Sequence, residues 1–309
     1  MLVSPEASIL LCTRNRSVDL AKTLASLVAA VRDQSIPFEI VVIDNGSTDD
    51  TAQVATSTLG EFGRCVSEPK TGLSNARNRA LQEAKGDVLV FLDDDVETNP
   101  TWLPALLKPI WEGLPAISGS VKMGADLERP WMTERHRVMF AETMPVPADG
   151  KVLLTGANMA FSRDVLKKVP AFDPELGAGA LGFCEETLFS EQLLRAGFKI
   201  GRTEESRVIH WFQADRLRRE SMLRAATNLG KSLAYMRYHW SHDEEEVPLV
   251  ARARMMAKQK LEGILKNKPE EGADVSEIDR ATAQGYHAQL QLEKQRPRQY
   301  EKFGLMKTG

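Results

Sequence analysis

Three consecutive aspartates, Asp93, Asp94 and Asp95, follow the apolar run "VLVFL". Packing alone does not call for them, because a carboxylate cluster at the end of a buried segment repels itself. On an extended segment, residues two apart point the same way, so Asp93 and Asp95 can face one hard cation. Mg²⁺ or Mn²⁺ usually takes one or two carboxylates, with phosphate oxygens and water completing its shell. The spacing favours such a site over the plainer alternative, in which acids merely end a strand.

The elements that must position these aspartates alternate between strand and helix patterns. Short apolar runs predict strands, and apolar residues at helical spacing predict helices between them. The predicted strands are residues 8–12, 38–43, 63–67 and 88–92, and the clearest helices are residues 18–31 and 73–84. Strands separated by helices imply right-handed crossovers and a mostly parallel sheet, which is an α/β fold.

Polar side chains follow three of these strands. They lie in residues 13–16, 44–50 and 93–95. In an open parallel sheet, ligands bind beyond the carboxyl ends of the strands. We therefore expect the three clusters to converge on one edge of the sheet.

The rest of the chain divides into an irregular middle and a helical end. The middle predicts a helix over 102–111, a strand over 116–123, an irregular excursion over 124–150, and then a strand and a helix within 152–169. The end predicts helices over 216–240, 250–265 and 277–293. We predict a catalytic body over 1–213, with halves of about 1–98 and 99–213, and a helical extension over 214–309.

Composition places the chain among ordinary globular proteins. It has 309 residues, 42% of them hydrophobic and 27% charged, with a formal net charge of −3. The pI near 6.1 argues against a nucleic-acid-binding module. Three cysteines fit neither a disulfide framework nor a paired metal site, and no apolar run approaches the roughly 20 residues of a membrane-spanning helix. We expect a soluble cytoplasmic protein.

One competing motif is tested by a single position. Haloacid-dehalogenase-type phosphatases also place Asp-x-Asp after an apolar strand, but they then require Thr or Val two residues after the second Asp. Glu97 occupies that position here. The phosphatase hypothesis is therefore the weaker one.

Six blocks of the sequence resemble, in order, those of inverting family 2 glycosyltransferases with a GT-A fold. They are "TRNRSVDLAKTLASL", "FEIVVIDNGSTDDT", "GLSNARNRAL", "GDVLVFLDDDVETNPTWL", "TGANMAFSRDVLKKVPAFDPELG" and "CEETLFSEQLLRAGFKI". The resemblance covers about residues 7–212. It implies transfer of a sugar from a nucleotide donor to a hydroxyl acceptor, with Mg²⁺ or Mn²⁺ as cofactor. UDP is the expected carrier, with dTDP and GDP as alternatives.

The resemblance also assigns donor-site roles to individual residues. Asp44 would accept a hydrogen bond from the base, and Arg77 would pair with phosphate. Asp95 would be the direct metal ligand, and Asp93 would reach the ribose or a metal-bound water. The residues expected to contact substrate are Thr13, Arg16, Asp44, Gly72, Asn75, Arg77, Asp93, Asp94, Gly156 and Asn158.

Three further residues receive catalytic or metal-binding roles from the same resemblance. Glu186 would be the general base that takes the proton of the attacking hydroxyl, and Glu185 its neighbour in contact with acceptor or donor. The family more often has Glu-Asp at this pair, so which acid is the base stays open. His210, in "RVIHWF", would lie near the metal and the diphosphate. The glycine-rich residues 177–182 would form a mobile lip over the substrates.

The expected partners are a nucleotide-sugar donor and a hydroxyl acceptor, either a saccharide or a lipid-linked molecule. Residues 214–238 are basic and partly amphipathic, so a peripheral membrane contact is an alternative to simple packing on the body. A homodimer is also left open. Two other function classes are kept as alternatives: a Mg²⁺-dependent phosphoryl or nucleotidyl transferase, and a degenerate nucleotide-sugar-binding scaffold.

Overall fold

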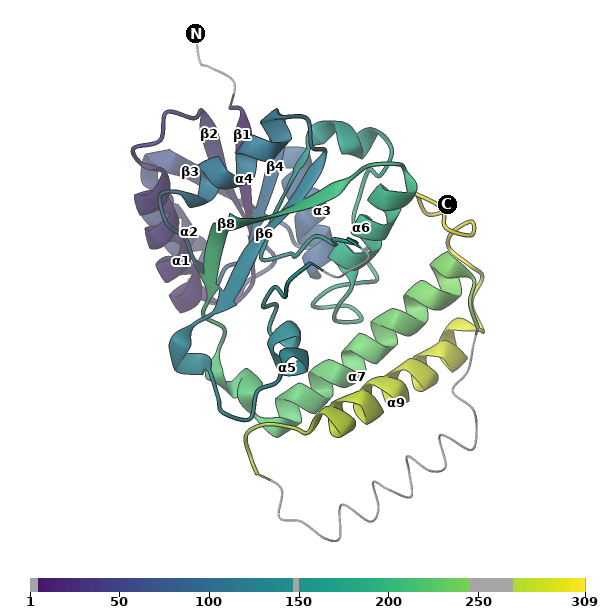
Figure 1. Cartoon of the computed structure of the whole chain (residues 1–309). Helices are drawn as coiled ribbons and strands as arrows, with labels where there is room; N and C mark the ends of the chain where they lie inside the picture. Colours follow the sequence, from purple (N-terminus) through teal and green to yellow (C-terminus); the bar gives the residue numbers. More distant parts are fainter. Residues whose placement is uncertain (1–4, 147–149, 245–268, 309) are drawn as a thin grey trace. The chain divides into compact units, whose positions relative to one another are not determined.

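An eight-stranded mixed sheet forms the centre of the larger of two units of the chain (Figure 1). The strands are β1 (Ala7–Thr13), β2 (Phe38–Asp44), β3 (Gly63–Ser67), β4 (Val88–Leu92), β5 (Val96–Glu97), β6 (Ala116–Met123), β7 (Asn158–Ser162) and β8 (Ile200–His210). Their order across the sheet is β3-β2-β1-β4-β7-β6-β8-β5. Strands β1 to β4 are parallel, and so are β6 and β8. Strand β7 is antiparallel to β4 and β6, and β5 is antiparallel to β8.

The computed structural model of this protein describes residues 5–146, 150–244 and 269–308. The first unit comprises Met1–Ala180 and Glu185–Phe212, and the second comprises Leu181–Cys184 and Gln213–Gly309. The short loop Leu181–Cys184 thus belongs with the helical unit, although it lies within the predicted body. Its Phe183 backbone N–H donates to the Ser232 hydroxyl of that unit at 3.1 Å.

Helices cover both faces of the sheet in the first unit (Figure 1). They are α1 (Ser17–Val31), α2 (Thr51–Leu59), α3 (Leu73–Glu83), α4 (Trp102–Trp111), α5 (Glu134–Met139) and α6 (Glu185–Arg195), with 3₁₀ turns at Gly60–Phe62, Ala125–Leu127 and Arg163–Lys167. Because both faces are covered, the central strands consist of nearly continuous apolar residues and do not alternate. The sequence-based prediction of an α/β fold is confirmed.

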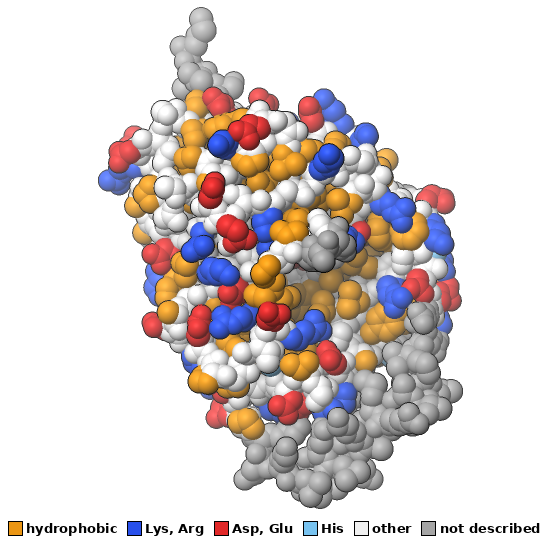
Figure 2. Space-filling model, in the orientation of Figure 1, with side chains coloured by type: hydrophobic (Ala, Val, Ile, Leu, Met, Phe, Trp, Pro, Cys, Tyr) orange, Lys and Arg blue, Asp and Glu red, His pale blue; other side chains and the backbone are white. Residues whose placement is uncertain are grey.

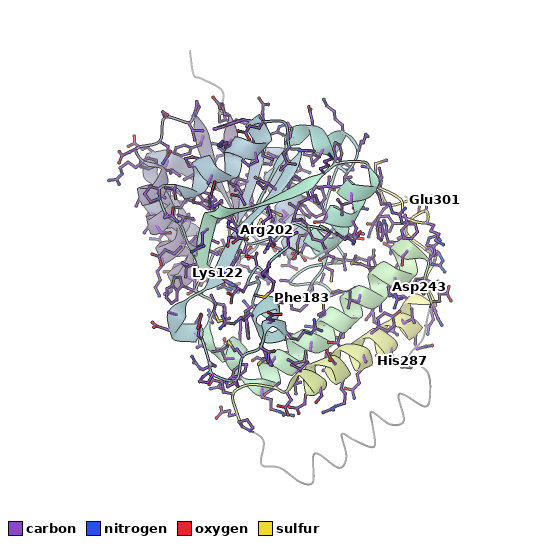
Figure 3. The ribbon with its side chains drawn as sticks, viewed as in Figure 1. Lys122, Phe183, Arg202, Asp243, His287 and Glu301 are labelled. Atoms are coloured by element: carbon purple, nitrogen blue, oxygen red, sulfur yellow. The ribbon has the colours of Figure 1, made fainter. Side chains whose placement is uncertain are left out.

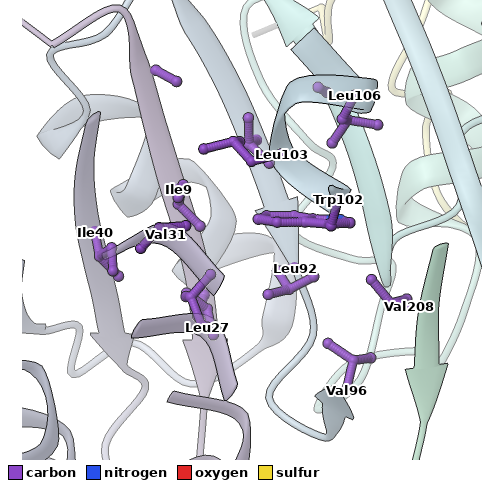
Figure 4. Close-up of a cluster of buried hydrophobic side chains, with 14 of the residues drawn as sticks. Ile9, Leu27, Val31, Ile40, Leu92, Val96, Trp102, Leu103, Leu106 and Val208 are labelled. Atoms are coloured by element: carbon purple, nitrogen blue, oxygen red, sulfur yellow. The ribbon is translucent and has the colours of Figure 1, made fainter. Parts of the chain in front are cut away.

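The two faces of the sheet have separate cores. On one face, α1 and α4 bring Leu27 and Trp102 against Ile9 and Leu92 of the strands (Figure 4). On the other face lies a ladder of phenylalanines, in which Phe161 of β7 has its ring centroid 5.1 Å from that of Phe189 in α6. Helix α3 lies on this second face as well, since its Arg77 stands over the ring of Phe91 in β4.

Several predicted elements change in extent. Strand β8 begins at Ile200, well before the block "RVIHWF" that contains His210, and its pairing with β6 shifts register between Gly119 and Ser120. The strand expected near residue 152 begins only at Asn158, and a 3₁₀ turn replaces the helix after it. The excursion over 124–150 contains α5, which starts in a capping box at Thr133. The helix predicted over 250–265 lies outside the described residues.

The second unit contains two long helices that lie side by side (Figure 1), α7 (Arg219–Tyr235) and α9 (Val275–Glu293). A short 3₁₀ turn (Ala214–Leu217) precedes α7, and a π-helical turn (Met236–Ser241) follows it. A Cβ on Gly230 would lie 1.9 Å from the Thr282 carbonyl oxygen, and one on Gly285 would lie 2.0 Å from that of Thr227. The two glycines therefore allow the helix backbones to touch.

Charges of both signs are interspersed on the face seen in Figure 2. In the second unit the arginines of the basic segment 214–238 find acidic partners: Arg218 with Glu270, Arg219 with Glu277, Arg224 with Glu220 and Arg237 with Asp243. Among the described residues, no helix has the length and apolar character needed to cross a membrane.

Candidate active site

The polar clusters after β1, β2 and β4 meet at one edge of the sheet, as expected. Thr13, the last residue of β1, pairs in register with Asp44, the last residue of β2. The Thr13 hydroxyl donates to the Asp94 carboxylate at 2.7 Å, which ties β1 to the aspartates after β4. Asp44 is 7% exposed and accepts a hydrogen bond from the Ser47 backbone N–H at 3.2 Å.

Arg16 joins two of the three aspartates. Its Nη2 donates to Asp95 Oδ2 at 2.6 Å, and its Nε lies 3.2 Å from Asp94 Oδ1. The turn that places it is built on Asn15, whose φ of +52° is a conformation that asparagine tolerates better than most residues. The Asn15 backbone N–H donates to the Ser47 hydroxyl at 2.9 Å, so the turns after β1 and β2 hold each other.

Gly72 connects the start of α3 to the glycine-rich loop 177–182. Its φ is +123°, and its N–H donates to Asn45 Oδ1 at 2.8 Å. The next residue, Leu73, donates its N–H to the Ala178 carbonyl oxygen at 2.8 Å. A Cβ on Gly179 would lie 3.1 Å from Gly72 Cα, so glycine at both positions permits this close approach.

Arg77 is the cation between the acidic pair and the aspartates. Its Nη1 donates to Glu185 Oε1 at 2.8 Å, and its Nη2 lies 3.8 Å from Asp93 Oδ1. The side chains of Arg77 and Glu185 are only 3% and 6% exposed, so little solvent screens their attraction. This guanidinium thus places two groups that are far apart in the sequence on either side of one positive charge.

Aromatic rings and a glycine fix the position of the Arg77 guanidinium. Its central carbon lies 5.5 Å from the centroid of Phe172 and 5.9 Å from that of Phe91, within cation–π range. A Cβ on Gly156 would lie 2.4 Å from Arg77 Nη2. Gly156, expected to contact substrate, therefore leaves room for this arginine.

The acidic pair opens helix α6. Glu185 is buried against Arg77, whereas Glu186 is partly exposed. Burial, together with the neighbouring carboxylate of Glu185, raises the pKa of Glu186 from 4.5 to about 8. A carboxylate with a pKa near the working pH is suited to accept a proton from a hydroxyl.

His210 ends β8 beside the aspartates, with both ring nitrogens in contact. Nδ1 lies 2.8 Å from the Phe140 carbonyl oxygen, and because that oxygen can only accept, Nδ1 carries the proton. Nε2 lies 3.2 Å from Asp95 Oδ1. In the neutral tautomer, the lone pair of Nε2 therefore faces a carboxylate, an arrangement that a second proton or a cation relieves. A histidine held through its other nitrogen by a backbone carbonyl is typical of metal ligands.

Arg16 and Arg77 do not fully offset the three neighbouring carboxylates. Burial, together with Asp95, raises the pKa of Asp94 to about 7 despite Arg16. The Asp93 side chain keeps 36% exposure, yet loss of surrounding solvent and the nearby Asp95 raise its pKa too. Among the described residues, no group of three or more His, Cys, Asp or Glu side chains is arranged to hold a metal ion. Mg²⁺ and Mn²⁺ often take only one or two protein carboxylates, with phosphate and water as their other ligands, so Asp95 with one neighbouring side chain would be enough for such an ion.

Two of the residues expected to contact substrate lie inside the protein. Asn158 is 0% exposed, and its amide is used within the protein: Oδ1 accepts from Trp102 Nε1 at 2.9 Å, and Nδ2 donates to the carbonyl oxygens of Ser120 and Ser206 at 3.0 and 2.9 Å. Asn158 thus ties the sheet together. Arg77, expected to pair with phosphate, is buried between carboxylates and aromatic rings. Asn75 remains partly exposed at the start of α3, where its Nδ2 donates to the Thr71 carbonyl oxygen at 2.9 Å.

Sequence reasoning does not find two residues of this site, Phe140 and Phe172. Phe140 contributes only a backbone carbonyl, which leaves no signal in the sequence, and it lies in a segment predicted to be irregular. Phe172 is a common core residue type, and its position under Arg77 depends on the tertiary fold. The block "AFDPELG" contains it but does not single it out.

Comparisons with known proteins identify the family of this chain. Residues 8–170, more than half of the chain, match the family model described as glycosyl transferase family 2. A transferase of Serratia proteamaculans named for undecaprenyl-phosphate 4-deoxy-4-formamido-L-arabinose is 26% identical over 38% of this chain and 37% of its own length. The succinoglycan biosynthesis protein ExoM of Rhizobium meliloti is 32% identical over 46% of both chains. The matches thus span less than half the length of these two relatives.

Solved structures show the same fold. A mannosyltransferase from Pyrobaculum calidifontis, in complex with GDP-Man and Mn²⁺, has a TM-score of 0.55 at 16% identity, over 96% of this chain and 77% of that one. Glucosyl-3-phosphoglycerate synthase from Mycobacterium tuberculosis, with Mn²⁺, UDP-glucose and phosphoglyceric acid, has a TM-score of 0.50 at 25% identity, over 73% of this chain and 79% of that one. The likeness establishes a GT-A fold.

Proposed function

Because the chain belongs to glycosyl transferase family 2, we propose that it transfers a sugar from a nucleotide-diphosphate donor to a hydroxyl acceptor, with inversion at the anomeric carbon. The observation that carries the proposal is the position of Arg77. It contacts Glu185 at 2.8 Å and lies 3.8 Å from Asp93, so it links the acidic pair to the aspartate cluster. Single displacement needs a base on one side of the reacting carbon and charge stabilisation on the other.

The donor would bind at the ends of β1, β2 and β4. Asp44 accepts from the base, Thr13 and Arg16 shape the nucleotide cradle, and Asp93 with Asp95 faces the diphosphate. A divalent cation held by Asp93, Asp95 and His210 would neutralise the charge that develops on the departing diphosphate. UDP-glucose and GDP-Man are bound in the two structures of similar fold, which supports a nucleotide sugar, with UDP as our expectation.

The acceptor hydroxyl would lose its proton to Glu186. Arg77 keeps Glu185 in place, so Glu185 acts as a positioning residue, and Glu186 is the partly exposed acid that can reach a substrate. The relative named for undecaprenyl phosphate and the one named for succinoglycan support a lipid-linked or saccharide acceptor in the synthesis of a cell-surface polysaccharide or glycoconjugate. We keep a cytoplasmic site of action, a peripheral membrane contact through residues 214–238 and a homodimer as predictions.

The proposal is tested by incubating the protein with a panel of nucleotide sugars and acceptors, with and without Mn²⁺. We expect metal-dependent release of a nucleoside diphosphate and a product of inverted anomeric configuration by NMR. Transfer of a nucleotidyl or phosphoryl group would instead support the other enzyme class. Binding of nucleotide without turnover of any donor would support a scaffold. Failure to bind any nucleoside diphosphate, with or without Mn²⁺, would refute the proposal.

A further inference from the structure

Arg202, near the start of β8, is a partly buried cation with few partners. Its Nη1 donates to the Met144 carbonyl oxygen at 2.6 Å, and its Nε is buried with no hydrogen-bond partner in the described part of the chain. No acid lies within ion-pair distance of it among the described residues. Burial lowers the pKa of Arg202, and only Glu204 opposes this effect. Even partial burial of a cation without a counter-ion carries a cost, which an anionic ligand would offset.

Arg163 shows what a purely structural arginine looks like in the same unit. It too has carbonyl partners, but its Nε and Nη2 donate three hydrogen bonds, to Gly86 and Ala84, at 2.7–2.9 Å. Those contacts close the end of a helix and leave the group well satisfied. Arg202, with one such bond, does not fit that role.

The register of the sheet places Arg202 on the same face as Arg77. Phe91 pairs with Met159, Met159 with Ser118, and Ser118 with Arg202, and paired residues point to the same side of a sheet. Arg77 stands over Phe91 on that face. Three strand spacings separate the backbones of Phe91 and Arg202, roughly 14 Å. Figure 3 labels Arg202 beside β6 and β8.

The Arg202 guanidinium reaches a segment that pairs with β6. Thr143 pairs with Val121 of β6 through its backbone N–H at 3.0 Å, and Met144, the partner of Arg202, follows it. Arg202 therefore crosses β6 from β8. On the same face, the Ser118 hydroxyl donates to Thr155 Oγ1 at 3.1 Å. Thr155 adjoins Gly156, which borders the Arg77 guanidinium.

We propose that Arg202 is the counter-ion of an oxyanion, a carboxylate or a phosphate ester, that the acceptor carries away from its reacting hydroxyl. This inference rests on the proposed function, because it places Arg202 in the acceptor half of a glycosyltransferase. A planar guanidinium suits either oxyanion, and binding energy from a remote group can be used to orient the hydroxyl for reaction. The acceptor is then an acidic saccharide or a phosphorylated molecule, and a neutral sugar is the poorer substrate.

The test measures oxyanion binding directly, by calorimetric titration of the whole protein saturated with UDP and Mg²⁺. Inorganic phosphate is the probe in one arm and acetate in the other. The variants are Arg202→Gln, which removes the charge, Arg202→Lys, which keeps the charge, and Arg207→Gln, an exposed control on the same strand. Binding of UDP, dTDP and GDP is measured first, and a wild-type protein that binds none of them refutes the proposed function separately from the role of Arg202.

We expect at least about a tenfold loss of affinity in Arg202→Gln for one probe, a smaller loss in Arg202→Lys and no change in Arg207→Gln, since a charge-assisted hydrogen bond contributes that much. The probe whose affinity falls in Arg202→Gln, acetate or phosphate, identifies the oxyanion of the acceptor as a carboxylate or a phosphate ester. The proposal is overturned when wild-type protein binds neither probe. It is also overturned when Arg202→Gln binds both probes as the wild type does, or when Arg207→Gln loses as much.

Discussion

Replacing Glu186 with Gln tests the assignment of the base while preserving the size of the side chain. The variant can still donate and accept hydrogen bonds, but it cannot take a proton from the acceptor. General base catalysis typically contributes about 10²–10⁴-fold, so we expect transfer to fall by that factor. Nucleotide binding should stay within about twofold, because the donor-site contacts of Thr13, Arg16 and Asp44 do not involve Glu186.

The raised pKa gives this substitution a second, independent readout. A rise from 4.5 to about 8 means that the folded protein disfavours ionised Glu186 by up to about 5 kcal/mol, at 1.36 kcal/mol for each pKa unit. Proton linkage gives the direction in which the free energy of unfolding changes with pH. Between pH 4.5 and 8 the folded state binds more protons at Glu186 than the unfolded state does. The stabilising contribution of Glu186 is therefore full below pH 4.5 and is lost as the pH rises through 8. Glu186→Gln has no such dependence.

The assay is urea unfolding at pH 5 and pH 9 for wild type, Glu186→Gln and the exposed control Glu205→Gln. From pH 5 to pH 9 we expect wild type to lose at least about 1 kcal/mol relative to Glu186→Gln, a lower figure than the limit because the structure relaxes around a buried charge. The kcat/KM of wild type should rise with pH to a plateau, with its midpoint near 8. The assignment would be refuted if Glu186→Gln transferred sugar at the wild-type rate. It would also be refuted if the difference in stability between wild type and Glu186→Gln did not depend on pH.

The remaining predictions concern the donor site and its supports. Asp95→Asn should weaken Mn²⁺-dependent UDP binding at least about tenfold by calorimetry, since charged groups bind a cation far better than neutral ones; equal affinity would remove Asp95 from the metal site. Gly156→Ala should lower turnover, because the new Cβ would lie 2.4 Å from Arg77 Nη2 and displace the guanidinium. We expect this substitution to cost about 1–3 kcal/mol of stability. Unchanged turnover would show that the position of the guanidinium is unimportant. Asn158→Ala should cost about 2–4 kcal/mol of unfolding free energy, because it leaves three buried partners unpaired. The KM for the donor should stay the same. A raised KM with intact stability would instead support a direct contact between Asn158 and substrate.

Apolar strand patterns and polar clusters at strand ends predict much of this fold. The strands "VLVFL" and "FEIVVI" are apolar because helices cover both faces of the sheet, and this property is visible in one dimension. The cluster after each strand must then lie at the carboxyl edge, so the convergence of Thr13, Asp44 and Asp94 follows from topology.

What the sequence misses depends on contacts between distant segments. The antiparallel direction of β7 depends on how the chain between β6 and β7 returns, and periodicity does not report direction. Asn158 follows a glycine by two residues in "TGAN", a pattern equally compatible with a ligand loop, and only the fold places Trp102 against its amide. The burial of Arg77 likewise depends on Phe172 and Gly156, which no local pattern links to it.

The central claim is that Asp93, Asp95 and His210 hold the cation of a nucleotide-sugar site on the same side of the sheet as Arg77 and Glu186. A crystal of the protein with UDP and Mn²⁺, measured at the manganese absorption edge, tests it most directly. The claim predicts one anomalous peak bound to Asp95, with the uracil at Asp44 and the diphosphate at the metal. Manganese or nucleotide bound elsewhere on the protein, with Asp94 and Asp95 still paired with Arg16, would contradict it.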